Sequence, residues 1–198
     1  MESPDLAAFL ILQMETLADL NLRLKRKKGA MSWKKRSVDL LERLVEGYWR
    51  GDRFIAYGPG NVEIADSHSL FLYLPLVLGA RLPEKIRRAA LIRLKASGLI
   101  TRQGLATESP RSPLYEADGY WRGPIWAPST LLIVDGLRHM GEHALARSIS
   151  EKFCRLCAVS DFAENFDAQS GAGLRDRSYT WTASVFLILA RHYTGRQS

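Results

Sequence analysis

Apolar residues recur at three- and four-residue steps along most of the chain, which is the spacing of one face of an α-helix. Near the N-terminus, Ser3 is a favoured capping residue and Pro4 suits the first helical position, so we predict that a helix begins there. Its face is defined by Leu6, Phe9, Leu10, Gln13, Leu17, Leu20 and Leu24. Ser32 could cap a second helix. The apolar face of that helix would consist of Val38, Leu41, Leu44, Val45 and Tyr48.

Further predicted helices alternate with turns and loops. Residues 51–64 contain Gly-Asp and Gly-Pro-Gly-Asn sequences between short β-favouring runs, which predict a turn-rich loop or a small hairpin. A third helix is expected to begin near Asp66 or Ser67 and to run to Leu78, with Pro75 bending or ending it. The remaining helices are predicted over residues 82–98, 126–140, 142–157 and 179–192.

Two long segments, residues 99–124 and 160–178, are rich in Gly, Pro or polar residues and lack a helical period. Loops of this length in a compact domain are usually functional. Gly141 separates two predicted helices with almost no linker, as in an antiparallel helical hairpin. About seven helices, without a repeat of fixed period or an internal boundary, together predict a single all-α domain over residues 1–198.

The composition is that of a soluble globular domain, because 46% of the 198 residues are apolar and 25% are charged. No apolar run reaches the length needed to span a membrane. The chain starts Met1-Glu2-Ser3-Pro4, with an acid where a secretory signal would carry a base, and residues 6–12 form a helix face without a following cleavage site. We therefore expect a cytoplasmic protein.

Much of the net charge of +7 comes from residues 23–36, a run of lysines and arginines without an acid between Asp19 and Asp39. One interpretation is a patch for an anionic partner such as nucleic acid. The other is a solvated helix end, with cations placed favourably near a helix C-terminus. We favour the second interpretation, because Trp33 is the only aromatic residue in the run and nucleic acid is usually bound through interleaved aromatic rings.

The two cysteines, Cys154 and Cys157, are spaced C-x-x-C. A zinc site needs two more ligands, and the four histidines show no ligand spacing. These are His68, His139, His143 and His192. A thioredoxin-like site would need a preceding strand, whereas the flanks of this pair are helical in pattern. We therefore interpret the cysteines as ordinary buried thiols on a helix and predict neither a metal nor another cofactor.

The first chemically notable segment is Tyr120-Trp121-Arg122-Gly123-Pro124-Ile125-Trp126, which follows the acidic residues Glu116 and Asp118. Sugars present apolar C–H faces and polar hydroxyl rims. Aromatic rings pack against the faces, and arginine or carboxylate groups bind the hydroxyls. This composition favours a carbohydrate site. The alternative is that Trp121 and Trp126 are core residues that anchor a loop.

The second segment is residues 161–173, which leads into residues 178–184. Glu164 stands between apolar residues in a loop ahead of a helix, where a carboxylate could activate water as a general base. Gly171 and Gly173 would allow a tight turn or a close approach to a ligand. Glu164 could equally cap a helix or pair with Arg175 or Arg177.

The string Tyr-Trp-Arg-Gly-Pro-Ile-Trp at residues 120–126 resembles the YWRGxxW motif of glycoside hydrolase family 63. The string Glu-Asn-Phe-Asp at residues 164–167, with Ser170-Gly171 and with Tyr-Thr-Trp-Thr-Ala at residues 179–183, resembles a second motif of that family and of its mannosylglycerate-hydrolase-like members. The order and separation of the two motifs also match. The likeness is specific from Gly104 to Ala183 and only patterned before that. Trehalases and amylo-α-1,6-glucosidases have related toroids.

The resemblance implies an (α/α)6 toroid, built from two concentric rings of helices, and an inverting glycosidase. Such an enzyme places two carboxyl groups about 6.5–9.5 Å apart, so that a water molecule fits between the base and the sugar. Glu164 falls on the position of the family's general base. The positions expected to bind or support the substrate are Tyr120, Trp121, Arg122, Gly123, Trp126, Asn165 and Trp181.

The match is incomplete, because the family's general acid is an aspartate in an upstream segment resembling SGWDNSP, and this string is absent. Asp5 matches the start of the helix that follows that segment, so it is not assigned as the acid. A closed toroid has twelve helices, so about seven predict the C-terminal portion of a catalytic domain. We expect a partial toroid that is a marginal monomer or pairs with a second copy or a separate, missing N-terminal half, and that hydrolyses little alone.

Three functional hypotheses follow from these features. The first is an inverting hydrolase, α-glucosidase or mannosylglycerate-hydrolase-like, acting on an α-linked saccharide or a glycosylated small acid. The second is a non-catalytic carbohydrate-binding remnant, favoured by the missing acid. The third is a basic helical module that binds nucleic acid or protein through residues 23–36, and this one we regard as the weakest.

Overall fold

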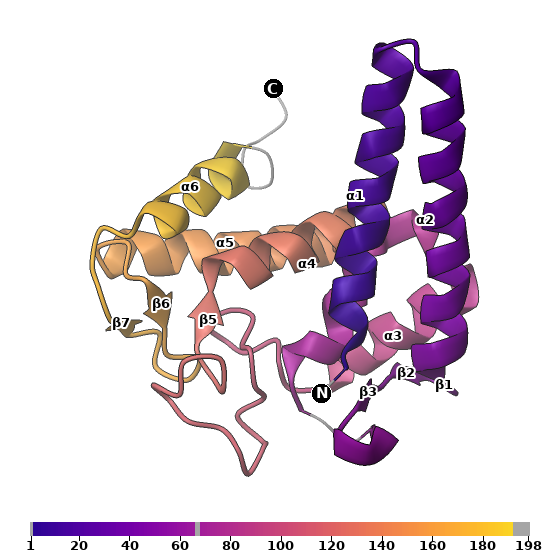
Figure 1. Cartoon of the computed structure of the whole chain (residues 1–198). Helices are drawn as coiled ribbons and strands as arrows, with labels where there is room; N and C mark the ends of the chain where they lie inside the picture. The colour runs from indigo at the N-terminus through magenta and orange to yellow at the C-terminus, as the bar shows by residue number, and fades with distance from the viewer. Residues whose placement is uncertain (1, 66–67, 192–198) are drawn as a thin grey trace.

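The computed structural model describes residues 2–65 and 68–191, and helices dominate this part of the chain (Figure 1). The α-helices are α1 (Pro4–Arg23), α2 (Lys27–Tyr48), α3 (Glu84–Ala96), α4 (Ala127–His139), α5 (His143–Val159) and α6 (Thr180–Leu189). Two 3₁₀ segments, η1 (Pro59–Asn61) and η2 (Leu70–Arg81), complete the helical elements. The prediction of a mostly helical chain with long loops is confirmed.

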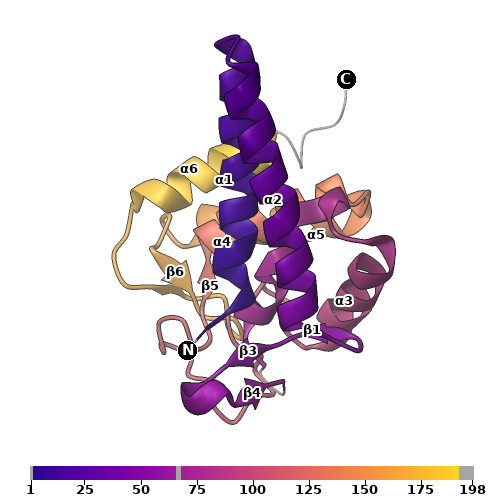
Figure 2. The ribbon, with the colours of Figure 1, turned by 45° about the vertical axis from the view of Figure 1, so that its right-hand side comes forward.

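Helices α1 and α2 form a long antiparallel hairpin whose tip projects beyond the body of the molecule (Figures 1 and 2). The predicted start of α1 is confirmed, with Ser3 extended at the N-cap and Pro4 in the first turn. The Ser3 hydroxyl, however, donates to the Asp5 carboxylate, and no helix N–H donates to the Ser3 side chain. The predicted start of α2 at Ser32 is wrong, because a tight turn with Lys25 in the left-handed region starts the helix at Lys27.

The third predicted helix is a 3₁₀ helix that continues through Pro75, and Gly79, with φ of +55° and ψ of −128°, interrupts it before Arg81. The predicted end of the helix at Leu78 is therefore confirmed. Its start near residues 66 and 67 lies outside the described residues, and the described helix begins after Ser69, whose hydroxyl accepts from the Phe71 N–H at 3.4 Å. Residues 74–79 are all buried. A run that is apolar on every side can therefore pass through the core of the molecule.

The predicted turn-rich region at residues 51–64 is confirmed as two small antiparallel hairpins. Strands β1 (Trp49–Arg50) and β2 (Arg53–Phe54) form the first, and β3 (Ala56–Tyr57) and β4 (Glu63–Ile64) form the second. Trp49 packs edge-on against Phe54 across the first hairpin, with ring centroids 4.9 Å apart.

A three-stranded antiparallel sheet was not predicted from the sequence. It consists of β5 (Ile125–Trp126), β6 (Asn165–Phe166) and β7 (Gly173–Leu174), in the order β5-β6-β7. Each strand has two residues, which is too short to show an alternating pattern. The sheet joins the end of the first long loop to the interior of the second.

The core lies where η2, α4 and α5 meet beneath α1 (Figure 2). Helix α4 approaches η2 so closely that a Cβ atom added at Gly136 would lie 2.2 Å from the Leu76 carbonyl oxygen. The α4–α5 hairpin turns at Gly141, as predicted, with φ of +84°. Helix α6 follows the predicted start at Tyr179, whereas its predicted end at His192 lies outside the described residues.

Candidate functional site

Strand pairing brings the two sequence motifs together. Trp126 in β5 lies opposite Asn165 in β6, one residue after Glu164, although the motifs are separated by about 40 positions in the chain. The buried Thr107 hydroxyl fixes the approach to β5, because it donates to the Pro124 carbonyl at 2.8 Å and accepts from the Gly123 N–H at 3.3 Å. The two segments singled out in the sequence therefore form one local structure.

Four aromatic side chains of these motifs form a continuous cluster. Trp121 stacks on Trp126 with centroids 4.5 Å apart and an interplanar angle of 14°. Trp181 meets the edge of Trp126 at 5.4 Å, and Tyr120 meets it at 4.7 Å. Stacked and edge-on ring contacts stabilise an aromatic pair by more than the burial of its surface alone.

The members of this cluster differ in exposure. Trp126 is fully buried and donates its indole N–H to the Tyr120 carbonyl at 2.8 Å. It therefore supports the wall from behind, and the expectation that Trp126 lines a sugar pocket is corrected in favour of the core interpretation. Trp121 and Trp181 are partly buried, and Tyr120 is 46% exposed, so these three present ring surface toward solvent.

The backbone of Glu164 is held on both sides beside this cluster. Its N–H donates to the Asp176 carbonyl at 2.7 Å, and its carbonyl accepts from the Trp181 indole at 3.2 Å. The side chain is partly buried. Burial, and after it the negative charge of Glu164, raise the pKa of Tyr179. Tyr179 also packs on Trp181, with ring centroids 5.0 Å apart.

Neither arginine proposed as an alternative partner of Glu164 binds it. Arg175 pairs with Asp118 at 2.9 Å and lies over the ring of Tyr120, and Arg177 pairs with Asp161 at 2.8 Å. Among residues 2–65 and 68–191, no ion pair reaches Glu164. The capping alternative is also not supported, because Glu164 precedes a strand and Tyr179 occupies the N-cap of α6.

Arg122 and Gly123 have structural roles in the same loop. The Arg122 guanidinium is exposed and pairs with Glu116 at 2.7 Å, so it lies at the rim of the aromatic cluster. Gly123 is buried, and a Cβ atom added there would lie 2.2 Å from the Glu116 carbonyl oxygen. The loop can close on itself only because position 123 lacks a side chain.

Asn165 is fully buried, and both polar atoms of its amide lack a hydrogen-bond partner among the described residues. The buried Thr130 hydroxyl in α4 lies one helical turn beyond Trp126 and likewise has no hydrogen-bond partner in that part of the chain. Buried polar atoms of this kind are usually satisfied by enclosed water. Because its side chain is buried, Asn165 can support the base from inside the protein and does not face the solvent.

The sequence did not single out a tyrosine–aspartate contact that joins the two motif loops. The Tyr115 hydroxyl donates to the Asp167 carboxylate at 2.8 Å. Burial, which opposes ionisation, is outweighed by hydrogen bonds from Ser170, the Gln169 N–H and Tyr115, and the pKa of Asp167 is lowered. Burial and then the Asp167 contact raise the pKa of Tyr115. The only sequence signal was that Asp167 lies within the second motif and Tyr115 shortly precedes the first.

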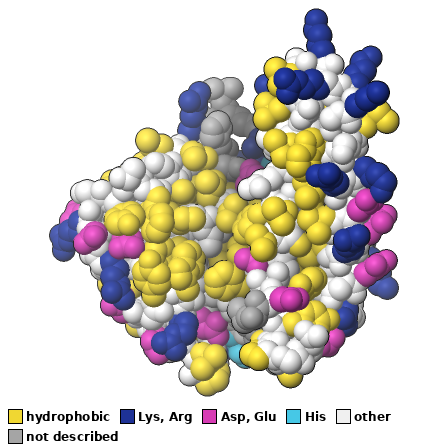
Figure 3. Space-filling model, in the orientation of Figure 1, with side chains coloured by type: hydrophobic (Ala, Val, Ile, Leu, Met, Phe, Trp, Pro, Cys, Tyr) yellow, Lys and Arg dark blue, Asp and Glu magenta, His cyan; other side chains and the backbone are white. Residues whose placement is uncertain are grey.

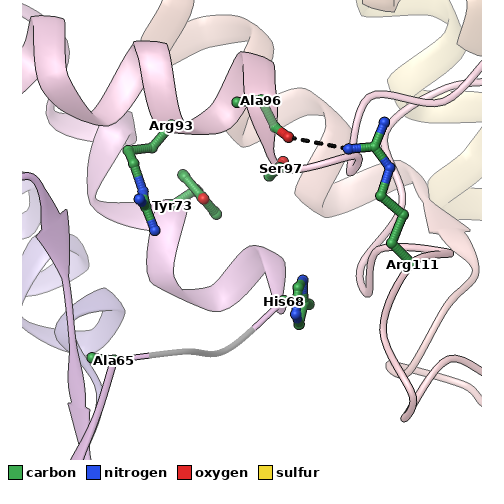
Figure 4. Close-up of a pocket in the computed structure, with 7 residues that line it drawn as sticks. All are labelled: Ala65, His68, Tyr73, Arg93, Ala96, Ser97 and Arg111. Atoms are coloured by element: carbon green, nitrogen blue, oxygen red, sulfur yellow. Dashed lines mark hydrogen bonds between the residues drawn. The ribbon is translucent and has the colours of Figure 1, made fainter.

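Two sizeable cavities are lined by described residues, and Glu164 is in the lining of neither. One, of about 390 Å³, lies between α1 and α2. The other, of about 290 Å³, is lined by Tyr73, Arg93, Arg111 and their neighbours (Figure 4). Arg93 pairs with Asp52 at 3.2 Å, and Arg111 donates to the Ala96 carbonyl at 3.5 Å. The described lining of this second cavity holds no carboxylate, so it does not provide a pair of acids for hydrolysis.

The cysteines lie on α5, as predicted, with Cys157 buried and Cys154 partly buried. Burial raises the pKa of Cys154 to about 11 and that of Cys157 to about 12. Within the described ranges, no group of three His, Cys, Asp or Glu side chains is arranged to hold a metal ion. No helix of the same residues is long and apolar enough to cross a bilayer.

Comparison with solved structures identifies the architecture. A mannosylglycerate hydrolase of Thermus thermophilus, assigned to family GH63 and solved with Tris, superposes on 93% of this chain with a TM-score of 0.76 and 24% identity. The neutral trehalase Nth1 of Saccharomyces cerevisiae superposes on 98% of the chain with a TM-score of 0.74 and 17% identity. The chain covers 45% and 38% of these two proteins. Its fold is therefore a partial (α/α)6 toroid.

Sequence comparison agrees with the fold. A mannosylglycerate hydrolase from a second strain of Thermus thermophilus is 31% identical over 60% of this chain, and that of Rubrobacter radiotolerans is 29% identical over 86%. The chain spans only 28% and 39% of the length of these relatives. Residues 1–182 match the family described as the mannosylglycerate hydrolase MGH1-like glycoside hydrolase domain. With more than nine-tenths of its length matched, the chain belongs to this glycoside hydrolase family.

Proposed function

We propose that this chain carries the general base and part of the sugar-binding wall of an inverting glycoside hydrolase, with Glu164 as the base. The observation that carries the proposal is the placement of Glu164 beside the aromatic cluster. The Trp181 indole N–H donates to the Glu164 carbonyl, the Glu164 N–H donates to the Asp176 carbonyl, and no ion pair of the described residues involves the Glu164 carboxylate. A carboxylate that is held in place and not neutralised by a partner can accept a proton from water.

Each group in the cluster has a specific role in this mechanism. The exposed surfaces of Tyr120, Trp121 and Trp181 pack against the apolar face of a sugar ring. Buried Trp126 keeps Trp121 and Trp181 in place, because it contacts both rings. Glu164 then removes a proton from a water molecule that attacks the anomeric carbon from the face opposite the leaving group.

The second carboxyl group, which protonates the leaving oxygen, comes in this proposal from the part of the ring that the chain does not span. Inversion requires the two carboxyl groups to be about 6.5–9.5 Å apart, so the acid must face Glu164 across the sugar. The isolated chain should therefore bind sugar weakly and hydrolyse little, because both carboxyl groups contribute to lowering the barrier.

The proposed substrate is an α-linked saccharide or a glycosylated small acid. Relatives include mannosylglycerate hydrolases, a glucosylglycerate hydrolase of Mycolicibacterium hassiacum and periplasmic trehalases. The Thermus structures were solved with glucose and with D-glycerate. Exposed Arg122 at the rim of the cluster offers a cation for an anionic aglycone such as glycerate.

The test separates binding from chemistry. Glucose and D-glycerate titrations should change the tryptophan fluorescence of the chain, and Trp181→Phe should reduce the change, whereas Trp33→Phe on the distant α1–α2 hairpin should not. In a complete toroid containing this chain, Glu164→Gln should lower turnover of mannosylglycerate or trehalose by at least about 100-fold while sugar binding persists. Glu151→Gln, at an exposed glutamate on α5 outside the motif loops, is the control.

Turnover that survives Glu164→Gln would exclude the base assignment. A sugar-binding chain whose complete toroid is inactive on every glycoside would instead favour the carbohydrate-binding remnant. The nucleic-acid hypothesis would be favoured by tight binding of DNA or RNA to the exposed cations of residues 23–28, without any response to sugar.

A further inference from the structure

One face of α1 is exposed and, except for Gln13, apolar. Leu6 and Leu24, at the two ends of this face, are 64% and 62% exposed, and Leu10, Leu17 and Leu20 between them are exposed as well. The opposite face of the same helix, with Ala8, Ile11 and Ala18, is buried in the core. Figure 3 shows hydrophobic side chains gathered along α1 and over the region of β5, α4 and α6 on the same face of the molecule.

The spacing of these leucines is that of a helix–helix contact. Together with Gln13, the exposed positions are Leu6, Leu10, Gln13, Leu17, Leu20 and Leu24, at steps of four, three, four, three and four residues. We call this set the α1 seam. A stripe with an average step of 3.5 residues packs against a second helix running alongside, in the knobs-into-holes manner of coiled coils. The seam spans roughly 27 Å, at about 1.5 Å per residue, so its partner helix must be of similar length.

Such a stripe is unusual on a protein that has no partner. Single exposed leucines are common on soluble proteins, whereas a contiguous apolar strip marks an interaction site. Two further exposed apolar residues, Leu187 and Ile188, lie next to each other on α6. Figure 1 shows α1 and α6 at different ends of the α4–α5 pair, so the molecule has two apolar edges that are far apart.

The size of the relatives indicates what covers both edges. The chain superposes on 45–48% of the length of the Thermus structures, so about half of their ring is outside it. A complementary half-ring has two ends and can cover both edges at once. Pairing of α1 with α1 of a second copy would leave α6 uncovered. Pairing of α1 with the described part of α6 from a copy is too short, because its 10 residues span only about 15 Å.

We infer that the α1 seam is the docking surface for a complementary half-toroid of the same family, whether it belongs to the same polypeptide or to a separate one. The partner presents a long helix with apolar residues at 3.5-residue steps. Near the hairpin tip this helix carries acidic residues, because Arg23, Lys25, Arg26, Lys27 and Lys28 are all exposed there. The inference concerns the fold and does not depend on the proposed hydrolase activity.

The first measurement is made on the chain alone. Sedimentation velocity should show reversible self-association, and the dye ANS should bind, because the seam is open to solvent. Leu10→Gln with Leu17→Gln should reduce both signals at least twofold. The control variant, Ile92→Gln with Leu114→Gln, replaces two other exposed apolar residues outside the seam and should behave as the unchanged chain. A monodisperse monomer whose ANS binding is equal in all three proteins would overturn the inference.

The second measurement identifies the occupant. The portion of the Thermus thermophilus mannosylglycerate hydrolase not covered by this chain is fused ahead of it, and the thermal midpoint of the fusion is measured. In the fusion, the Leu10→Gln and Leu17→Gln pair should lower the midpoint by about 5 °C or more, because these leucines are then buried. In the isolated chain the same pair should leave the midpoint within about 2 °C.

Two results would count against the half-toroid. One is a fusion whose midpoint is insensitive to the seam substitutions. The other is a stable dimer of the isolated chain that the seam substitutions dissociate and that persists in the fusion, since this result would identify a second copy as the occupant.

Discussion

Replacing Tyr115 with phenylalanine removes a single hydroxyl and tests whether the two motif loops are held together as the structure indicates. The Tyr115 hydroxyl donates to Asp167 at 2.8 Å, and Asp167 also accepts the N–H groups of Gln169 and Ser170 at 3.1 Å each. A hydrogen bond to a charged group contributes about 1.5–3 kcal/mol when buried. Both partners are only partly buried, so water replaces part of it, and we expect a loss of about 1–1.5 kcal/mol.

The assay is thermal and urea unfolding followed by circular dichroism. A loss of this size should lower the thermal midpoint by about 2–6 °C for a chain of this length. Tyr48→Phe is the matched control, because the Tyr48 hydroxyl lies 3.4 Å from Glu2 in an exposed contact, and its removal should cost less than about 0.5 kcal/mol. Asp167→Asn and the double variant complete a cycle that isolates the pairwise energy.

The dependence on pH gives a second check. The pKa of Asp167 is lowered in the folded state, so the stability it contributes is fully present above its unfolded pKa, near 3.8, and is lost as pH falls through the lower folded value. The penalty of Tyr115→Phe should therefore be constant between about pH 5 and 8 and should shrink below about pH 4. Equal midpoints for Tyr115→Phe and the unchanged chain at pH 7, or a penalty that is the same at pH 3, would refute this reasoning.

Two further predictions concern single positions. Gly123→Ala should destabilise the chain by about 2 kcal/mol or more, because the new Cβ would lie 2.2 Å from the Glu116 carbonyl oxygen. Since 1 kcal/mol lowers the thermal midpoint by about 2–4 °C, a midpoint within about 1 °C of the unchanged chain would contradict the close approach. Cys154 and Cys157 should react with DTNB at pH 8 far more slowly in the folded chain than in urea, because burial raises the pKa of both thiols; equal rates in the two states would show that the helix does not protect them.

The helices were predictable because each buries one face and exposes the other over several turns. Helices α1, α3, α4 and α5 begin or end within a few residues of the predicted bounds, at Pro, Gly or a change in period. Helix α2 was predicted six residues too short, because its N-cap is Arg26 and not Ser32, its first turn has no capping side chain, and its start is set by the tight turn at Lys25. The 3₁₀ form of η2 was not predictable, since a run that is apolar on all sides has no period to read.

For the candidate site, the sequence predicted which aromatic residues lie together, but not which of them are buried and which reach the surface. It indicated that Trp121, Trp126 and Trp181 act together, whereas burial separates Trp126 as a support from the two rings that reach the surface. The pairing of β5 with β6 decides this, and strands of two residues leave no trace in the hydrophobic pattern. The contact of Tyr115 with Asp167 spans 52 positions and was likewise invisible to local patterns.

The same sheet explains why the proposed base and the aromatic wall must lie in one chain, whereas the second carboxyl group need not. The pairing of Trp126 with Asn165 fixes the distance from Glu164 to the rings within this chain. The distance to an acid across the α1 seam depends instead on helix register, and a slip of one heptad would move it by about 10 Å. That slip exceeds the whole window of about 6.5–9.5 Å that inversion allows. Gln13 is the one polar residue within the seam, and a polar residue at such a position fixes register at some cost in stability. We therefore expect Gln13 to help fix the register of a ring closed across this seam. Gln13→Leu should strengthen the association in sedimentation velocity while lowering turnover of the complete toroid.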